Sequence, residues 1–219
     1  MSEPNFPLIK PGLDILYQDS DLLILNKPAG LLTVPGKGPD KQDCLINRAI
    51  KLNPNARVVH RLDQGTSGIV MIPLNYITLR TLTKQFEERG IHKHYVAIVA
   101  GLVAQDQGEI QLPLICDWPN RPLQKVCYES GKPAHTRYRV LARDEDKKTT
   151  RVLLEPVSGR THQLRVHMLN LGHSIVGDQL YAPEDVRAMA PRLLLHARHI
   201  HLRHPISGES LTVDCEAEF

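Results

Sequence analysis

Residues 60–70, HRLDQGTSGIV, place a single carboxylate between a basic pair and a run of small residues. His60 and Arg61 precede Asp63, and a glycine-rich turn at 65–68 leads into an apolar stretch. Nearby positive charge favours the ionised form of a carboxylate, and an ionised aspartate on a turn can act as a nucleophile or a base. The alternative is that Asp63 only accepts hydrogen bonds from backbone amides of the turn. These residues alone favour the turn interpretation.

A second stretch whose side chains could take part in catalysis or binding is LEPVSGRTHQLRVH, at residues 154–167. A predicted turn at 158–159 follows a strand and places Arg160 at the start of a helix. On that helix Arg165 and Leu169 share one face, because they are four residues apart. The planar guanidinium group binds carboxylates and phosphates through paired hydrogen bonds. The alternative is a basic helix face that is simply solvated.

The elements that must position these residues are mostly short strands. Apolar or alternating runs bounded by Gly, Pro, Asp or Asn predict strands at 13–19, 21–28, 68–74, 94–101, 136–143, 149–157, 193–202 and 211–215. Helical spacing of apolar residues predicts helices at 44–52, 75–90 and 162–172. Many strands and few helices, without strict alternation, predict an α+β fold. We expect a mixed, largely antiparallel central sheet with a few flanking helices and loops.

The composition is that of an ordinary globular protein, with 219 residues, 42% of them hydrophobic and 23% charged. This length allows one sizeable core or two small ones. No apolar stretch approaches a membrane span, and the N-terminal MSEPNFPLIKPG lacks the features of an export signal. The net charge of +3 permits a polyanionic partner without requiring one. We therefore expect a cytoplasmic protein with four reduced cysteines and no membrane partner.

Common nucleotide-binding and hydrolase motifs are absent, namely GxGxxG after a strand, GxxxxGK(S/T), HExxH and GxSxG. A metal-dependent hydrolase is an alternative, because four histidines gather at 196–204 and two of them, His199 and His201, would share one strand face. Zinc sites usually combine histidines with carboxylates or cysteines, and no acid lies in that stretch. We expect no metal and no nucleotide or redox cofactor.

Several long stretches resemble the RluA family of RNA pseudouridine synthases. HRLDQGTSG at 60–68 and PVSGRTHQLRVH at 156–167 resemble its signature motifs. Further similar motifs are LNKPAGLLTVPG at 25–36, HKHYVAIVAG at 92–101, LGHSIVGDQLYAP at 171–183 and LLLHA at 193–197. The resemblance covers residues 17–219 in the family's motif order. It implies the pseudouridine synthase fold in a single catalytic domain, 1–219, of the short type that lacks an N-terminal S4 domain.

The resemblance also implies roles for individual residues. Asp63 corresponds to the family's catalytic aspartate, Arg165 to the arginine that pairs with it, and Tyr95 to the tyrosine that packs on the uracil ring. Arg61 matches a residue that fills the space left by a flipped base. Leu62 and Leu164 would then line the pocket, although a role in the core fits both residues as well.

Residues 118–125, WPNRPLQK, combine an aromatic side chain with cations and are predicted to form a loop that contacts RNA. Trp118 offers a ring for base stacking and Arg121 a cation for phosphate. The alternative is that Trp118 plugs the core beside a proline turn. We also expect His60 and Arg160 to contact RNA.

The implied reaction is the isomerisation of uridine to pseudouridine, in which N1–C1′ breaks, the base turns and C5 joins C1′. The reaction needs no cofactor, because nothing is oxidised or hydrolysed. Residues 112–138 resemble the family members that act on both 23S rRNA and tRNA, which implies hairpin substrates such as the anticodon stem-loop. A flipped base in a loop costs less than one in a duplex. We expect a monomer, and the remaining alternative is a non-catalytic RNA-binding protein that does not need Asp63.

Overall fold

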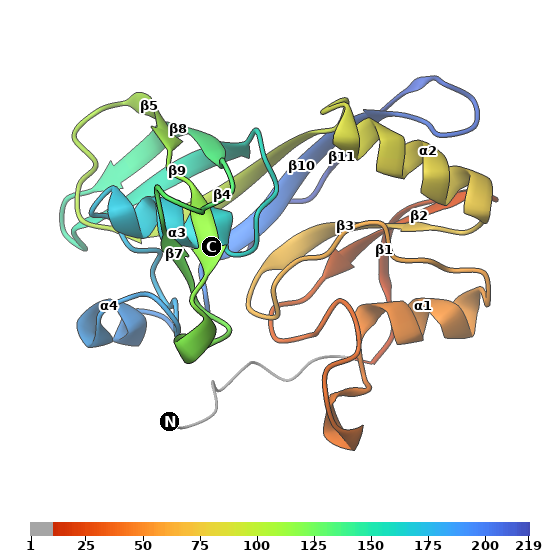
Figure 1. The fold of residues 1–219 in the computed structure, drawn as a ribbon, viewed down its shortest axis with the longest axis horizontal. Helices are drawn as coiled ribbons and strands as arrows, with labels where there is room; N and C mark the ends of the chain where they lie inside the picture. Colours follow the sequence, from red (N-terminus) through yellow and green to blue (C-terminus); the bar gives the residue numbers. More distant parts are fainter. Residues whose placement is uncertain (1–10) are drawn as a thin grey trace. The chain divides into compact units, whose positions relative to one another are not determined.

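The computed structural model describes residues 11–219, which divide into two compact units. The middle unit is His94–Leu195, and the flanking unit comprises residues 11–93 and His196–Phe219. Strands β4 (His92–Ala100) and β10 (Leu195–Arg203) carry the chain from one unit to the other (Figure 1). Most of the N-terminal stretch in which we expect no export signal lies outside the described residues.

The flanking unit contains a sheet in the order β1–β2–β3–β10, with β11 beside β10. Its other strands are β1 (Asp14–Gln18), β2 (Leu22–Lys27), β3 (Ser67–Pro73) and β11 (Ser210–Asp214). All of these pairs are antiparallel except the parallel pair of β3 with β10. All residues of β3 and nearly all of β2 are buried, which explains why both strands are continuous apolar runs.

The helical segments of the flanking unit are the 3₁₀ turn η1 (Pro39–Lys41), α1 (Leu45–Leu52) and α2 (Tyr76–Glu87). Helix α2 packs on β3. Its N-terminus is capped by Asn75, whose side-chain oxygen accepts a hydrogen bond from the Thr78 N–H at 2.9 Å. The Asn75 amide also donates to Asp21 at 2.6 Å, which fixes the start of the helix relative to the sheet.

The middle unit contains an antiparallel sheet in the order β4–β9–β8–β5. Its strands besides β4 are β5 (Gln107–Gln111), β8 (His135–Asp144) and β9 (Thr149–Pro156), with a separate hairpin of β6 (Leu114–Cys116) and β7 (Gln124–Val126). The helical segments are η2 (Trp118–Asn120), α3 (Gln163–Asn170) and α4 (Glu184–Ala188).

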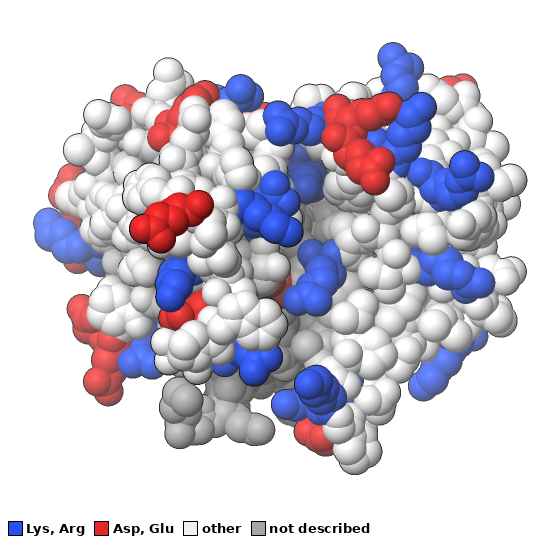
Figure 2. Space-filling view, in the orientation of Figure 1, with Lys and Arg blue, Asp and Glu red and all other residues white. Residues whose placement is uncertain are grey.

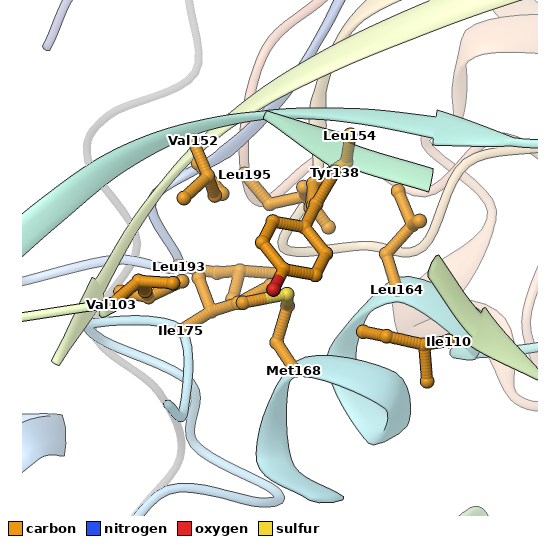
Figure 3. Packing of buried hydrophobic residues seen from close by; sticks show 12 residues of the cluster. Val103, Ile110, Tyr138, Val152, Leu154, Leu164, Met168, Ile175, Leu193 and Leu195 are labelled. Carbon is orange, nitrogen blue, oxygen red and sulfur yellow. The ribbon is translucent and has the colours of Figure 1, made fainter. Parts of the chain in front are cut away.

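The core of the middle unit forms where α3 packs on β7, β8 and β9. Figure 3 shows Leu164 and Met168 on the inner side of α3, facing Tyr138 of β8 and Leu154 of β9. These side chains are at most 7% exposed. Burial of such side chains contributes about 1.5–3 kcal/mol each, so this contact holds α3 and the residues it carries in place.

The predicted fold class is confirmed, since the structure is α+β with mostly antiparallel strand pairs and few helices. The eight predicted strands and three predicted helices are all present, with ends that differ by a few residues. The prediction that Arg160 begins a helix is wrong. Helix α3 begins at Gln163, because His162 adopts a left-handed conformation with φ 54° and the Arg160 N–H donates to the Gln163 side chain.

Three further predictions concern the chain as a whole. The four cysteines are free, as expected. No helix in the described part of the chain has both the length and the apolar character that a membrane crossing requires. The single catalytic domain over 1–219 stays a prediction.

Gly68 occupies the point where β3 runs closest to β10. Its φ is +106°, a conformation that L side chains rarely adopt, and an added Cβ would collide with the backbone of Ala197. Neither backbone segment can move away, because Ser67 pairs with His196 and Gly68 with Ala197 in the parallel ladder. The pairing of β3 with β10 therefore requires glycine at position 68.

We expect Gly68→Ala to lower the free energy of unfolding by about 3 kcal/mol, because it adds both backbone strain and a steric clash. Gly159→Ala is the matched control, since a Cβ there meets nothing within 4 Å and the backbone is not in the left-handed region. This control should change stability by less than about 0.5 kcal/mol in urea denaturation. Equal effects of the two substitutions would contradict the assignment of Gly68.

Candidate active site

The turn that carries Asp63 is fastened to the chain that follows β2 by a buried lysine. The side chain of Lys27 is 0% exposed, and its ammonium donates to the carbonyl of Gln64 at 3.2 Å. The same ammonium donates to the carbonyls of Pro28 at 2.9 Å and Leu31 at 2.7 Å. A buried charge is tolerated when it is hydrogen-bonded, so Lys27 fixes the residue that follows Asp63.

Further hydrogen bonds hold the turn on both sides of Asp63. The Gly30 N–H donates to the Gln64 carbonyl at 2.8 Å, and the Gln64 side-chain amide donates back to the Gly30 carbonyl at 3.0 Å. The Thr33 hydroxyl donates to the Leu62 carbonyl at 2.8 Å and accepts from the Leu62 N–H at 3.1 Å. Asp63 itself is half-buried. Its backbone is therefore rigidly placed while part of the residue stays accessible.

A third brace joins the end of the turn to β10. The Ser67 side chain lies 2.9 Å from Nδ1 of His196, and Nε2 of His196 lies 3.0 Å from the Cys215 carbonyl. Because a carbonyl only accepts, Nε2 carries a proton and donates to the Cys215 carbonyl. Both Ser67 and His196 are buried, so this arrangement is a structural clamp.

His60 is not the cation that the sequence suggests. Its Nε2 accepts a hydrogen bond from the Met71 N–H at 2.9 Å. Burial, and to a smaller extent the charge of Lys93, lower the pKa of His60 to about 3. The prediction of a basic pair beside Asp63 is therefore wrong for His60, which is neutral at pH 7. Arg61, which is exposed, supplies the positive charge of this segment.

Each of the remaining histidines of 196–204 forms a hydrogen bond with another side chain of the flanking unit. His199 pairs with Asp214 at 2.8 Å, and His201 with Thr212 at 2.9 Å, so these two histidines share a strand face as predicted. His204 pairs with Asp19 at 2.8 Å. Within residues 11–219 no group of three side chains is arranged to hold a metal ion.

In the middle unit, Arg165 is held by a carboxylate that the sequence analysis did not single out. Its Nε and Nη2 donate to Asp178 at 2.8 and 2.6 Å. Asp178 is 1% exposed and also accepts the N–H groups of Leu180 at 3.0 Å and Tyr181 at 3.2 Å. Arg165 is itself 6% exposed, so the alternative of a solvated basic helix face is wrong.

One local signal could have pointed to Asp178. An aspartate in a turn commonly accepts the backbone N–H groups two and three residues later, and Asp178 follows an apolar run and Gly177 in this way. Its arginine partner could not be deduced, because the pairing depends on how the loop folds back on α3.

The other predicted residues of the middle unit lie on different elements. Leu164 is 7% exposed within the core. Tyr95 is half-buried on β4, where it pairs with Leu154 of β9 and packs on the same core. Arg160 is exposed, and its Nε donates to the Pro133 carbonyl at 3.1 Å. In the flanking unit, Leu62 is buried at 6% exposure. Both leucines are therefore buried, as the alternative of a role in the core predicts. That they line the pocket stays a prediction.

The loop between β6 and β7 presents an exposed aromatic side chain. Trp118 is 65% exposed, and the guanidinium carbon of Arg121 lies 4.7 Å from its ring centroid. Lys125 forms an ion pair with Asp117 at 3.0 Å at the base of the loop. The alternative in which Trp118 plugs the core is therefore wrong. An exposed indole stacked on a guanidinium matches the chemistry of base stacking and phosphate binding.

The structure thus assembles the predicted site residues in two groups. His60, Arg61, Leu62 and Asp63 belong to the flanking unit, and Tyr95, Trp118, Arg121, Arg160, Leu164 and Arg165 belong to the middle unit. The predicted pairing of Asp63 with Arg165 joins residues of different units and stays a prediction.

The sequence matches a known family along most of the chain. Residues 21–170 match the family model described as RNA pseudouridylate synthase. The chain belongs to this family. It is 52% identical over 205 residues to the dual-specificity RNA pseudouridine synthase RluA of Yersinia pestis, covering 94% of this chain and 99% of that protein. The RluA protein of Escherichia coli (strain K12) is 51% identical over 213 residues, 97% of each chain.

A solved structure agrees with this assignment. Human RNA pseudouridylate synthase domain containing 1 superposes with a TM-score of 0.80 at 29% identity, covering 96% of this chain and 87% of that one. The chain is therefore an RNA pseudouridine synthase, an isomerase that converts uridine to pseudouridine in RNA. Neither the non-catalytic RNA-binding protein nor the metal-dependent hydrolase is favoured by these findings.

We expect Lys27→Met to lower the free energy of unfolding by about 3 kcal/mol, because three carbonyls lose a buried donor while the chain volume is roughly kept. Lys51→Met, at an exposed position of α1, is the matched control and should change it by less than about 0.5 kcal/mol. Urea denaturation of both variants measures the difference. A Lys27 variant as stable as the control would refute the role of the ammonium.

Proposed function

We propose that this pseudouridine synthase modifies uridines in hairpins of 23S rRNA and of tRNA, including the anticodon stem-loop. The observation that carries the proposal is the identity of about one half, over nearly the whole chain, to two proteins named as dual-specificity RNA pseudouridine synthases. The resemblance of residues 112–138 to members with these two substrates supports it further.

Asp63 is the proposed catalytic carboxylate. Its turn is fixed by hydrogen bonds on both sides, which suits a group that must meet a substrate in one orientation. An ionised aspartate can add to C1′ of the uridine, add to C6, or take the 2′ proton. Each route lets the N1–C1′ bond break and C5 join C1′ without a cofactor, and the C5 proton leaves to solvent.

Arg165 and Tyr95 are the proposed partners of Asp63. A guanidinium has five N–H donors, so the bidentate bond to Asp178 does not exhaust its capacity to bind a second carboxylate. Such a contact would orient Asp63 and favour its charged form. Tyr95 offers a half-buried ring for packing against the uracil and a hydroxyl that can assist proton transfer at C5.

The substrate uridine must leave its stack before it can react, at a cost of a few kcal/mol. We assign Arg61 to the space that the flipped base vacates, because its side chain is exposed next to the Asp63 turn. Leu62 and Leu164 are assigned to the walls around the flipped base.

RNA contacts away from the reacting uridine are assigned to Trp118 and Arg121, with Arg160 and His60 as further contacts. Lys and Arg side chains are distributed over both units on the face drawn in Figure 2. With a net charge of only +3, this distribution favours many separate phosphate contacts over one dense basic patch. His60 would contact RNA as a neutral group, given its low pKa.

The same proposal includes the organisation of the protein. The family match at 21–170 runs through residues of both units, which supports one catalytic domain made of 1–219. Four free cysteines suit the reducing cytoplasm. We assign the active form as a monomer, as the family resemblance implies.

We expect Asp63→Asn to lower tritium release from a hairpin RNA with 5-tritiated uridine by at least about 1,000-fold, since the neutral amide is a poor nucleophile and a poor base. The variant should bind the same hairpin with an affinity close to that of the unmodified protein. Asp40→Asn, an exposed aspartate of η1, is the matched control and should keep full activity. Normal tritium release by Asp63→Asn would refute the catalytic assignment.

Trp118 is the single tryptophan of the chain, so its fluorescence reports directly on the β6–β7 loop. We expect a hairpin RNA to quench it, with a Kd that rises steeply with salt because phosphate contacts release counterions. Arg121→Ala should weaken binding about tenfold, whereas Arg139→Ala, an exposed arginine of β8, should change it less than twofold. An unquenched tryptophan, or equal effects of the two substitutions, would exclude the loop from the RNA interface.

A further inference from the structure

Tyr181 lies where three parts of the middle unit meet. Its hydroxyl accepts a hydrogen bond from the Gln124 N–H at 2.8 Å and lies 2.7 Å from Nδ1 of His162. The guanidinium carbon of Arg165 lies 5.0 Å from the centroid of its ring. One half-buried side chain thus contacts the β6–β7 hairpin, the residue before α3 and the proposed catalytic arginine.

The first contact, between the Gln124 N–H and the Tyr181 hydroxyl, lies at the end of the exposed loop. Gln124 is the first residue of β7, and the loop before it carries Trp118 and Arg121. A movement of the loop that shifts the Gln124 N–H therefore acts directly on the Tyr181 hydroxyl.

The second contact joins the Tyr181 hydroxyl to His162, a residue with an unusual backbone conformation. His162 has a φ of 54°, a left-handed conformation that costs free energy in a residue other than glycine. Its imidazole is fixed both by the hydrogen bond to the Tyr181 hydroxyl and by an edge-on ring contact at 5.5 Å. Helix α3 begins at the next residue and carries Arg165 in its first turn.

The third contact is between the Tyr181 ring and the guanidinium of Arg165. Arg165 is bound by Asp178 on its donor edge and faces the Tyr181 ring, and Asp178 in turn accepts the Tyr181 N–H at 3.2 Å. A cation over an aromatic ring in a buried setting is a favourable contact. The orientation of Arg165 therefore depends on Tyr181 through both its ring and its backbone.

We propose that Tyr181 is a positioning residue that couples RNA contact at the Trp118–Arg121 loop to the orientation of Arg165. The inference rests on the proposed function and deepens it. Docking of RNA on the loop sets the Gln124 N–H, the hydrogen bond fixes the Tyr181 phenol, and the phenol fixes both α3 and the guanidinium. The enzyme thus reaches its full rate only on RNAs that occupy the loop.

Tyr181→Phe tests this coupling, because it keeps the ring and removes the hydroxyl that bridges Gln124 and His162. We expect the single-turnover rate at saturating hairpin RNA to fall about tenfold, while the Kd from Trp118 quenching changes less than twofold. Tyr128→Phe is the matched control, since Tyr128 is 78% exposed, and it should change neither quantity. An unchanged single-turnover rate for Tyr181→Phe would overturn the proposal.

A double-mutant cycle with Arg121→Ala gives a second, independent reading. If the loop acts through Tyr181, Arg121→Ala lowers the rate at saturating RNA as well as the affinity, and adding it to Tyr181→Phe lowers the rate no further. Rate effects that multiply would overturn the coupling. If Tyr181→Phe fails to fold, Arg121→Ala alone tests the coupling. An Arg121→Ala variant with a higher Kd but an unchanged rate at saturating RNA would overturn the coupling.

Failure of the coupling is distinguishable from failure of the proposed function. If the unmodified protein forms no pseudouridine in either hairpin, the substrate assignment fails before any variant is compared. If it forms pseudouridine and the cycle is multiplicative, the substrate assignment stands and only the role of Tyr181 is lost.

Discussion

The buried ammonium of Lys27 is the constraint on which the Asp63 turn depends. It donates to the carbonyls of Pro28, Leu31 and Gln64, and so joins the corner after β2 to the residue that follows Asp63. Removing a charge from water is unfavourable unless hydrogen bonds replace the lost hydration, and here three backbone oxygens do so. These bonds restrain the backbone of the turn, which is what a proposed catalytic carboxylate requires.

The middle unit fixes Arg165 by the same principle, with a carboxylate in place of the carbonyl oxygens. The guanidinium is buried, and Asp178 binds it while accepting two backbone N–H groups of its own loop. A buried ion pair is tolerated only when its remaining polar atoms are satisfied, and these hydrogen bonds meet much of that need. Hydrogen bonds within each unit thus help to position its proposed catalytic group.

The sequence predicts most of the fold because its strands are bounded by turn residues and its helices have clear apolar spacing. It misses β5, whose sequence QGEIQ has one apolar side chain, and β6 and β7, which are three residues long. Its motifs predict the site residues, but they do not predict the contacts that hold these residues in place. The Asp178 partner of Arg165, the neutral state of His60 and the left-handed His162 all depend on tertiary contacts that no local pattern encodes.

In the proposed mechanism, Asp63 meets the sugar or the ring of an extruded uridine in RNA. A structure of the Asp63→Asn variant bound to a hairpin that contains the target uridine tests it most directly. We expect the uridine to be flipped out of its loop with C1′, C6 or the 2′ hydroxyl within about 3.5 Å of the side chain at position 63. A bound hairpin in which every uridine lies far from that side chain would contradict it.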